Sequence, residues 1–367
     1  MSGVRARATR GLLATAAALL VTLTTACAGV SSHAAGVPDG GRRLADVAPV
    51  DDPRAVTGPS TAVVVDAAVR PVTQDPAPAL PVTLTDAQGT SVTVTDVSRV
   101  LALDVYGTLS RTVFELGLGD AVVGRDVSSG FAEIADRPLV TAGGHDLSAE
   151  AILDLAPTVV LTDTTLGPWD VVLQVRDAGI PVVVVDAHRD LQGVGGLVRQ
   201  VAAALGVPDA GEQLAQRTQA EVDATTAQIA AVAPADPADR LRVMFLYARG
   251  QAGVYYLFGE GSGADSLVEA LGAVDVAGEI GWQGMRPLND EGLVAAAPDV
   301  ILMMSDGLAS VGGVDGLLER LPAVASTPAG QHRRVVDMAD SQVLSFGPAT
   351  ADVLDALAVA LYAPEQS

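Results

Sequence analysis

Two stretches of this chain, AEAILDLAPTVVLTD (149–163) and DEGLVAAAPDVILMM (290–304), align without a gap and decide the fold. Five of the fifteen aligned positions are identical, and they include an Ala-Pro pair between a helix-forming segment and a continuous apolar run. Proline ends a helix, and such an apolar run is typical of a strand that is buried on both faces. The recurring unit therefore predicts two lobes of one design, each built on a mostly parallel sheet.

Strands and helices alternate around both repeats. Apolar runs predict strands at 99–104, 121–124, 158–163 and 181–186, and then at 240–248, 254–258, 299–304 and 334–338. Helix-forming segments lie between or after them, at 108–117, 148–155, 169–178, 263–271 and 348–362. An alternating hairpin is expected around a Gly-containing turn at 81–96. This order predicts an α/β fold of two doubly wound α/β lobes.

Residues 190–233 contain no strand signal and are rich in Ala, Gln, Leu and Glu. A break at Gly206-Val207-Pro208 divides them. We expect one long connecting helix over 209–233, between an N-terminal lobe at 79–208 and a C-terminal lobe at 234–367. Two similar lobes joined in this way are expected to bind a ligand between them, at the carboxyl ends of their strands.

The beginning of the chain has the composition of an export signal. Three arginines precede an uncharged run over 11–26, which is short for a membrane span and ends directly before Cys27, the only cysteine. We expect a lipoprotein signal peptide over 1–26 and lipidation of Cys27. An ordinary signal peptide or an uncleaved anchor is the alternative. Residues 27–78 show no sustained period and are expected to be the lipidated cysteine and a flexible tether.

The composition excludes several classes of function. A formal net charge of −22 argues against binding to nucleic acid or to anionic lipid. The sequence has no GxSxG elbow, Walker loop, CxxC pair or HExxH helix, so we expect no enzyme. Hydrophobic residues make up 49% of the chain, which supplies a large core, but aromatic residues only 3%. Each tyrosine and tryptophan is therefore a candidate worth examining.

Several motifs resemble a known family. LGLGDAVVGRD (116–126), the repeated segment and ALGAVDVAG (270–278) are similar to the periplasmic-binding-protein class that serves iron–siderophore, cobalamin and haem ABC importers. The resemblance covers residues 80–362. GGHDLSAEAILDLAPTVVLTD, FLYARG and MRPLNDEGLVAAAPDVILMM look like actinobacterial hemin-binding lipoproteins. This implies the class III architecture of that family, with ferric haem b as the transported ligand.

Three polar residues lie at the predicted ends of strands. His145 lies in the glycine-rich loop GGHDLS, and Tyr247 and Arg249 are two apart, which places them on one face of a strand. Phenolate suits ferric iron, and a neighbouring guanidinium favours the anionic form of a phenol. Without the resemblance, a surface histidine and a tyrosine packed by an arginine stem are the simpler interpretation. The resemblance implies that His145 and Tyr247 bind the haem iron and that Arg249 supports the tyrosine.

Four further residues are candidates for contact with the ligand. Met304 ends the second repeated strand and either packs on porphyrin or belongs to the core. Trp282 lies on a loop from which its indole is expected to cover the macrocycle. Tyr106 follows the first strand of the first lobe. Arg286 is a candidate partner for a propionate.

The resemblance also implies one exposed carboxylate per lobe that docks on the ABC transporter permease. Glu269 matches the position in the second lobe. Arg111 occupies the first-lobe position, so Glu115, four residues later on the same helix face, is expected to replace it. We expect a lipid-anchored monomer on the outer face of the cell membrane that takes up haem, with other cell-surface haem-binding proteins as candidate donors. A ferric-siderophore or corrinoid binder of the same fold is the first alternative, and a cell-wall haem-processing enzyme the second.

Overall fold

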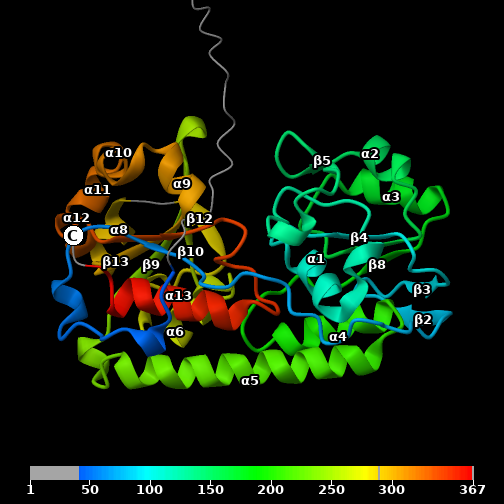
Figure 1. Cartoon of the computed structure of the whole chain (residues 1–367). Helices are drawn as coiled ribbons and strands as arrows, with labels where there is room; N and C mark the ends of the chain where they lie inside the picture. Colours follow the sequence, from blue (N-terminus) through cyan, green and yellow to red (C-terminus); the bar gives the residue numbers. More distant parts are fainter. Residues whose placement is uncertain (1–40, 288–289, 366–367) are drawn as a thin grey trace, which may run out of the picture. The chain divides into compact units, whose positions relative to one another are not determined.

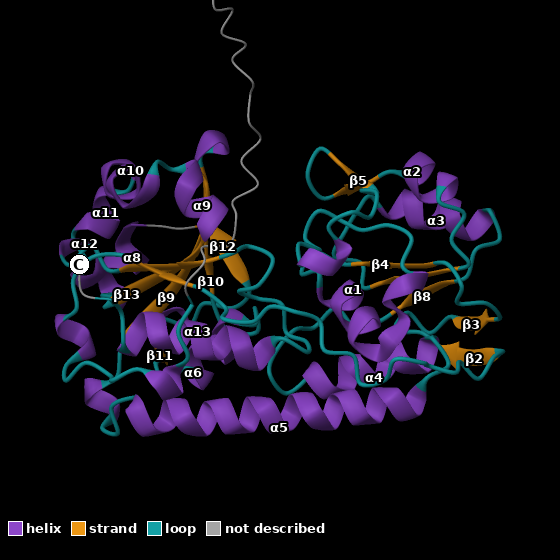
Figure 2. Ribbon diagram, in the orientation of Figure 1, coloured by secondary structure: helices purple, strands orange, loops and turns teal. Residues whose placement is uncertain are grey.

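The first lobe is built on a short parallel sheet (Figure 1, Figure 2). The structure is a computed structural model that describes residues 41–287 and 290–365, all within one compact unit. Strands β4 (Val100–Leu103), β7 (Val159–Thr162) and β8 (Val182–Val184) pair in the order β4-β7-β8. Every residue of the three strands is buried, as the continuous apolar runs predicted.

Helices cover both faces of this sheet. They are α1 (Thr108–Val113), α2 (Ala149–Asp154), α3 (Trp169–Asp177) and α4 (Val194–Ala204). Leu109 of α1 and Val198 of α4 pack with Leu161 on one face. Ile152 of α2 and Val172 of α3 pack in the cluster on the other face. The doubly wound arrangement predicted for this lobe is therefore confirmed.

Smaller elements of the first lobe agree in part with the sequence. The predicted hairpin forms as β2 (Val82–Thr85) and β3 (Ser91–Val94). The strand predicted over 121–124 does not form, and only one bridge joins Val122 to Val100. The strand is absent because the tight helical turn Gly119–Ala121 takes up its first residue, which leaves too little extended chain for a ladder. A two-residue pairing joins β5 (Thr141–Ala142) to β6 (Asp146–Leu147).

Helix α5 (Pro208–Val232) connects the lobes over 25 residues. It begins at Pro208, where a missing N–H costs nothing, two residues after Gly206 with φ +72°. Its bounds agree within one residue with the predicted connecting helix. It packs on α4 of the first lobe and on α13 (Thr350–Tyr362) of the second (Figure 1).

The second lobe holds a seven-stranded sheet. Its main order is β1-β14-β13-β9-β10-β12, and β11 also pairs with β9. The strands are β1 (Ser60–Ala62), β14 (Val335–Met338), β13 (Val300–Met304), β9 (Arg242–Arg249), β10 (Val254–Phe258), β12 (Met285–Pro287) and β11 (Val274–Asp275). Pairing is parallel from β1 to β9 and antiparallel for β10 and β12.

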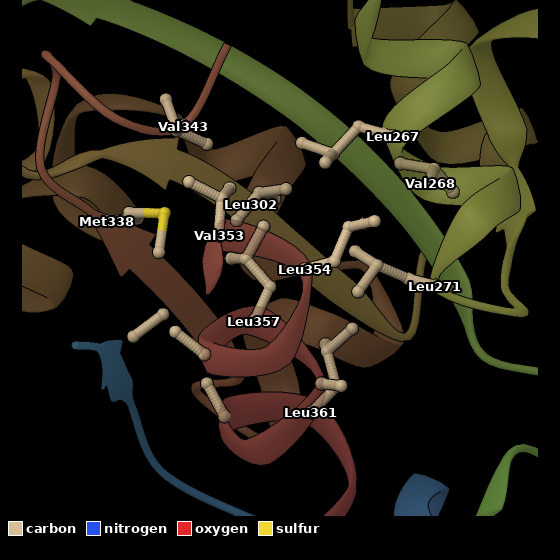
Figure 3. Close-up of a cluster of buried hydrophobic side chains, with 14 of the residues drawn as sticks. Leu267, Val268, Leu271, Leu302, Met338, Val343, Val353, Leu354, Leu357 and Leu361 are labelled. Atoms are coloured by element: carbon tan, nitrogen blue, oxygen red, sulfur yellow. The ribbon is translucent and has the colours of Figure 1, made fainter. Parts of the chain in front are cut away.

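Two separate hydrophobic clusters lie on the two faces of this sheet. One contains Val243, Phe245 and Leu302 with α6 (Ala264–Ala270) and α13, and Figure 3 shows many of its side chains. The other contains Met244 and Leu246 with the remaining helices of this lobe. Those helices are α7 (Val276–Glu279), α8 (Asp290–Ala296), α9 (Ser305–Ser310), α10 (Gly313–Arg320), α11 (Pro322–Ala325) and α12 (Pro328–Gln331). We name the clusters the α13 face and the α9 face.

The internal repeat is preserved in backbone geometry. Ala156 follows α2 with φ +42°, and Ala297 follows α8 with φ +44°. A positive φ is uncommon for a residue with a side chain, so the same unusual turn occurs at equivalent positions of both lobes. β7 and β13 follow as central buried strands. The alignment of 149–163 with 290–304 therefore reflects a shared unit.

The prediction of a flexible tether is wrong for residues 41–78. Leu44 is buried in the α13-face cluster, and β1 adds a parallel strand beside β14 at the edge of the second-lobe sheet. Val72 then packs on the core of the first lobe. The segment lacks a periodic pattern because other parts of the chain hold it. This stretch therefore crosses between the lobes, as α5 does.

Charged side chains hold this crossing segment. Arg111 donates to the carbonyls of Ala67 and Ala68, both at 2.6 Å. Glu115 accepts from the backbone N–H of Arg70 at 3.0 Å. Arg217 of α5 donates to the Arg70 carbonyl at 2.6 Å and to Glu115 at 2.9 Å. These bonds replace the regular ladder that the segment lacks.

The predicted signal peptide over 1–26 and Cys27 lie outside the described residues. Within the part that is described, no helix combines the length and the apolar character needed to cross a bilayer.

Candidate functional site

Tyr247 lies where the sheet of the second lobe emerges from its covering helices. Side chains alternate along β9, so Val243, Phe245 and Tyr247 share the α13 face. Val243 and Phe245 are fully buried there, whereas Tyr247 is half-buried. The strand therefore carries the phenol past the end of the core. The predicted placement of Tyr247 and Arg249 on one face of a strand is confirmed.

The Tyr247 ring is contacted from two directions along its strand. The guanidinium carbon of Arg249 lies 4.8 Å from the ring centre. On the other side, the ring of Phe258 is stacked at 6.1 Å with an interplanar angle of 16°. The register explains this, because Phe258 pairs with Phe245, two residues before Tyr247. Sequence reasoning missed Phe258.

Arg249 also contacts an acid. Its Nη2 donates to Asp340 at 3.4 Å, and the other carboxylate oxygen of Asp340 accepts from the backbone N–H of Asp306 at 3.0 Å. Burial raises the pKa of Asp340, and the Arg249 charge opposes that shift. Asp340 stands in a loop without a motif, so sequence reasoning missed it.

His145 lies on the loop between β5 and β6, as the sequence predicted. Gly143 and Gly144 precede it with φ of +58° and +102°, values that favour glycine. Its side chain is exposed and forms no hydrogen bond or ion pair with any described residue. Ser148 caps α2 just beyond the loop, accepting from the N–H of Ala151 at 3.3 Å. His145 and Tyr247 belong to different lobes, and within the described residues no contact joins them.

Tyr106 occupies the boundary between the lobes. It follows β4 of the first lobe yet packs against the α13-face cluster of the second. Arg189 lies 5.3 Å from the centre of its ring. Across the same boundary, Ser266 of α6 accepts from the N–H of Leu191 at 3.1 Å. The structure therefore places Tyr106 beside the second lobe, and its contact with the ligand stays a prediction.

A buried acidic cluster lies behind Tyr106. Asp104, Asp126 and Asp163 have no exposed surface, and Arg189 pairs with Asp163 and, at 3.5 Å, with Asp104. Burial, together with the charges of Asp163 and Asp126, raises the pKa of Asp104 to about 8, against the pull of Arg189. Burial likewise raises the pKa of Asp126 to about 6. The sequence carried a signal for two of these acids, since Asp104 and Asp163 each follow a buried strand.

The other candidate contact residues separate into two groups. Met304 is half-buried against the α13-face cluster, on the same face as Tyr247. Trp282 packs against the α9-face cluster instead. Arg286 pairs across β12 and β10 with Leu257, a member of that same cluster, and donates to the carbonyl of Gln283 at 3.2 Å.

Arg286, by strand alternation, and Trp282, by its packing on the α9-face cluster, therefore lie on the opposite face of the second-lobe sheet from the phenol of Tyr247. Their expected contacts with the ligand stay predictions. Met285, the neighbour of Arg286, pairs with Phe258 and hence shares the Tyr247 face. Met285 is 55% exposed, so an uncovered thioether stands on the same face of the sheet as Tyr247.

The two docking candidates also differ. Glu269 is exposed on α6 of the second lobe, as a docking carboxylate requires. Glu115 is only 1% exposed and is paired with Arg111 at 2.8 Å and with Arg217 at 2.9 Å. The prediction for Glu115 is therefore wrong. The N-terminal segment covers that helix face, and the carboxylate is used to hold it.

The fold and these residues agree with one family. The chain matches the periplasmic binding protein family over residues 105–341 and belongs to it. The arrangement of two doubly wound lobes and one linking helix is the class III architecture of such proteins.

Individual relatives add detail. The heme binding protein HmuT has a TM-score of 0.80 and 46% identity, over 85% of this chain and 99% of HmuT. HmuT has also been solved with one histidine, one tyrosine or one arginine replaced by alanine, and that arginine lies two positions after that tyrosine. The heme-binding protein BhuT, solved with two hemes, has a TM-score of 0.63 and 34% identity over 72% of this chain and 97% of BhuT.

A curated relative binds a different tetrapyrrole. The cobalamin-binding protein of Halobacterium salinarum is 28% identical over 251 residues, or 67% of this chain. The matched part spans 65% of the length of that relative.

Proposed function

We propose that this protein is an exported haem-binding protein that captures ferric haem b between its lobes and delivers it to an ABC importer. The observation that carries the proposal is the half-buried phenol of Tyr247 with the Arg249 guanidinium 4.8 Å from its ring centre. Likeness to HmuT, at 46% identity, supports haem as the ligand. The Tyr-x-Arg spacing found in this chain is also the spacing of the tyrosine and arginine replaced in HmuT.

Tyr247 is the proposed anionic ligand of the iron. Tyrosine is an established haem ligand, and phenolate is a hard donor suited to Fe(III). The nearby guanidinium offsets the negative charge that such a ligand brings. Tyr247 is only half-buried, and Phe258 and Arg249 contact its ring.

His145 is the proposed second ligand, from the first lobe. Its imidazole is exposed and uncommitted within the described residues, and it stands on a loop whose glycines allow a tight approach. Two protein ligands would leave the iron no open position for a reactant. This supports a carrier rather than a haem-processing enzyme.

Tyr106 and Met304 are proposed to contact the macrocycle. Both pack against the α13-face cluster, Tyr106 from the first lobe and Met304 from the second. An aromatic ring and a polarizable thioether suit the flat apolar faces of a porphyrin. The exposed Met285 extends the same surface.

Membrane attachment and docking complete the proposal. Lipidated Cys27 would hold the protein at the outer face of the cell membrane, and Glu269 would contact the permease. A Glu269→Arg variant should bind hemin normally and fail in haem uptake by intact cells. Normal uptake would leave Glu269 as an ordinary surface group.

A corrinoid is the alternative ligand, supported by the cobalamin-binding relative. A corrin arrives with its own axial ligands and needs no protein-to-metal bond, so the two ligands can be separated by titration. Hemin and cyanocobalamin are each added to the purified protein while the absorption spectrum is recorded. The proposal predicts a saturable phenolate-to-iron band with hemin at about one haem per chain, and weaker binding of cyanocobalamin. Tight cobalamin binding without a hemin signal would favour the alternative.

A further inference from the structure

A continuous stack of aromatic rings leads from the core of the second lobe to Tyr247. Phe245 is fully buried, and the ring of Phe258 stacks on it at 5.0 Å with an interplanar angle of 18°. Phe258 in turn stacks on Tyr247 at 6.1 Å and 16°. The near-parallel geometry of both pairs lies within the range at which aromatic rings attract one another.

The register of the strands explains why this stack points at Tyr247. Phe258 of β10 stands directly opposite Phe245 of β9, and Tyr256 stands opposite Tyr247. Phe258 is therefore the diagonal neighbour of Tyr247, a distance that aromatic side chains can bridge. Arg249 approaches Tyr247 from the other direction along β9. The phenol ring is thus held between a ring and a cation.

Tyr247 needs such support because of where it lies. It stands near the end of β9, and helices α6 and α13 cover the residues before it. A half-exposed side chain at a strand end would otherwise sample several rotamers. Binding a ligand would then require that freedom to be lost, at a cost in affinity. Arg249 contacts the ring through a side chain that is 36% exposed, whereas Phe258 is stacked on the fully buried Phe245.

We propose that Phe258 is a positioning residue for Tyr247, which fixes the plane of the phenol ring before the ligand arrives. The ligand part of this inference rests on the proposed function, whereas the ring contact does not. Phe258 touches no reacting atom in this scheme and acts only through Tyr247.

The first test uses the ligand-free full-length protein. The chain has five tyrosines, so 3-fluorotyrosine labelling should give five ¹⁹F resonances, and Tyr247→Phe assigns the one that matters. Phe258→Leu keeps an apolar side chain but removes the ring current, so it should shift and broaden the Tyr247 resonance. Phe131→Leu is the matched control, because Phe131 is a half-buried member of an aromatic pair with Phe114 in the first lobe. It should leave the Tyr247 resonance unchanged.

The second test uses hemin. Phe258→Leu should weaken hemin binding by roughly two- to tenfold, the range of one aromatic pair interaction, and broaden the phenolate-to-iron band. Phe258→Tyr restores a ring and should restore both values. Phe131→Leu should bind as the parent protein does.

The outcomes separate the two ideas. An unmoved Tyr247 resonance in Phe258→Leu overturns the positioning role, whatever the ligand. A shifted Tyr247 resonance with unchanged hemin affinity and spectrum also overturns the positioning role, because the restraint would then have no effect on hemin binding. If the parent protein forms no phenolate band with hemin, the proposed function fails, and the NMR result still decides whether Phe258 orders Tyr247.

Discussion

The guanidinium of Arg249 serves two partners at once, the ring of Tyr247 and the carboxylate of Asp340. Its carbon lies 4.8 Å from the ring centre, and its Nη2 lies 3.4 Å from Asp340 Oδ2. Asp340 is in turn bound by the backbone N–H of Asp306. The cation is therefore held at the ring by a neighbour that is fixed to the first turn of α9.

Removal of this cation should weaken the proposed complex. A cation near an aromatic face contributes about 0.5–2 kcal/mol, so Arg249→Ala should lower hemin affinity by roughly two- to thirtyfold. An absorption titration measures this directly. Asp340→Asn keeps the guanidinium and serves as the control, with a smaller expected loss. Equal affinity in Arg249→Ala and the parent protein would show that the cation contributes nothing to ligand binding.

Glu115 should matter for stability rather than for docking. It is 1% exposed and paired with Arg111 and Arg217, so Glu115→Ala leaves two cations and the Arg70 N–H without their partner. Breaking such a buried pair costs about 3–5 kcal/mol of unfolding free energy. Urea denaturation measures the loss. The exposed Glu212, paired with Arg199 on the surface, is the control, and Glu212→Ala should leave the midpoint nearly unchanged. A small effect of Glu115→Ala would mean that the crossing segment does not depend on this carboxylate.

The acidic cluster predicts an unusual pH dependence. The pKa of Asp104 is about 8 in the folded protein, above the ordinary value of 3.8, because of burial and the charges of Asp163 and Asp126. The folded state therefore binds more protons than the unfolded state between about pH 4 and pH 8. The contribution of Asp104 to stability is therefore expected to fall as pH rises through this window. Asp126, with a pKa of about 6, adds to the loss between about pH 4 and pH 6.

An amide in place of Asp104 should remove most of this dependence. Asn resembles the protonated acid and does not titrate. The unfolding free energy of Asp104→Asn, relative to that of the parent protein, should therefore increase as pH rises from 4 to 8. Urea midpoints at pH 5, 6.5 and 8 test the trend. If the parent protein instead becomes more stable than Asp104→Asn as pH rises, Asp104 is ionised and stabilising.

Attachment to the membrane is predicted to depend on Cys27. A thioether-linked diacylglyceryl group supplies two chains, whereas a single chain holds a protein only marginally. Cys27→Ser should therefore move the protein from the membrane fraction to the medium. Cys27→Ala should behave identically. Retention of both variants at the membrane would indicate an uncleaved signal anchor.

Much of the fold was predictable because it rests on local pattern. Continuous apolar runs such as 158–163 and 299–304 indicate buried parallel strands wherever they occur. Residues 41–78 gave no such pattern, since their order comes from distant side chains such as Arg111 and Glu115. The face of the sheet that Arg286 occupies could not be predicted for a related reason, because it depends on the register of β12 against β10.

In the candidate site too, local features were predictable from the sequence and features that depend on other elements were not. The spacing of Tyr247 and Arg249 is local and was correctly placed on one face. Phe258 and Asp340 come from other elements, and only strand pairing and loop packing bring them to Arg249 and Tyr247. The placement of His145 opposite Tyr247 stays a prediction, because it concerns two lobes and no described contact joins the two side chains.

Binding of the haem iron by both Tyr247 and His145 is tested most directly by the absorption spectrum of hemin titrated into the parent protein, Tyr247→Ala and His145→Ala. The parent protein should show a phenolate-to-iron charge-transfer band, and Tyr247→Ala should lose it. His145→Ala should keep that band and change spin state, because the sixth ligand is lost or replaced by water. Parent-like spectra and affinity in both variants would contradict the account and leave a ligand that makes no bond to either residue.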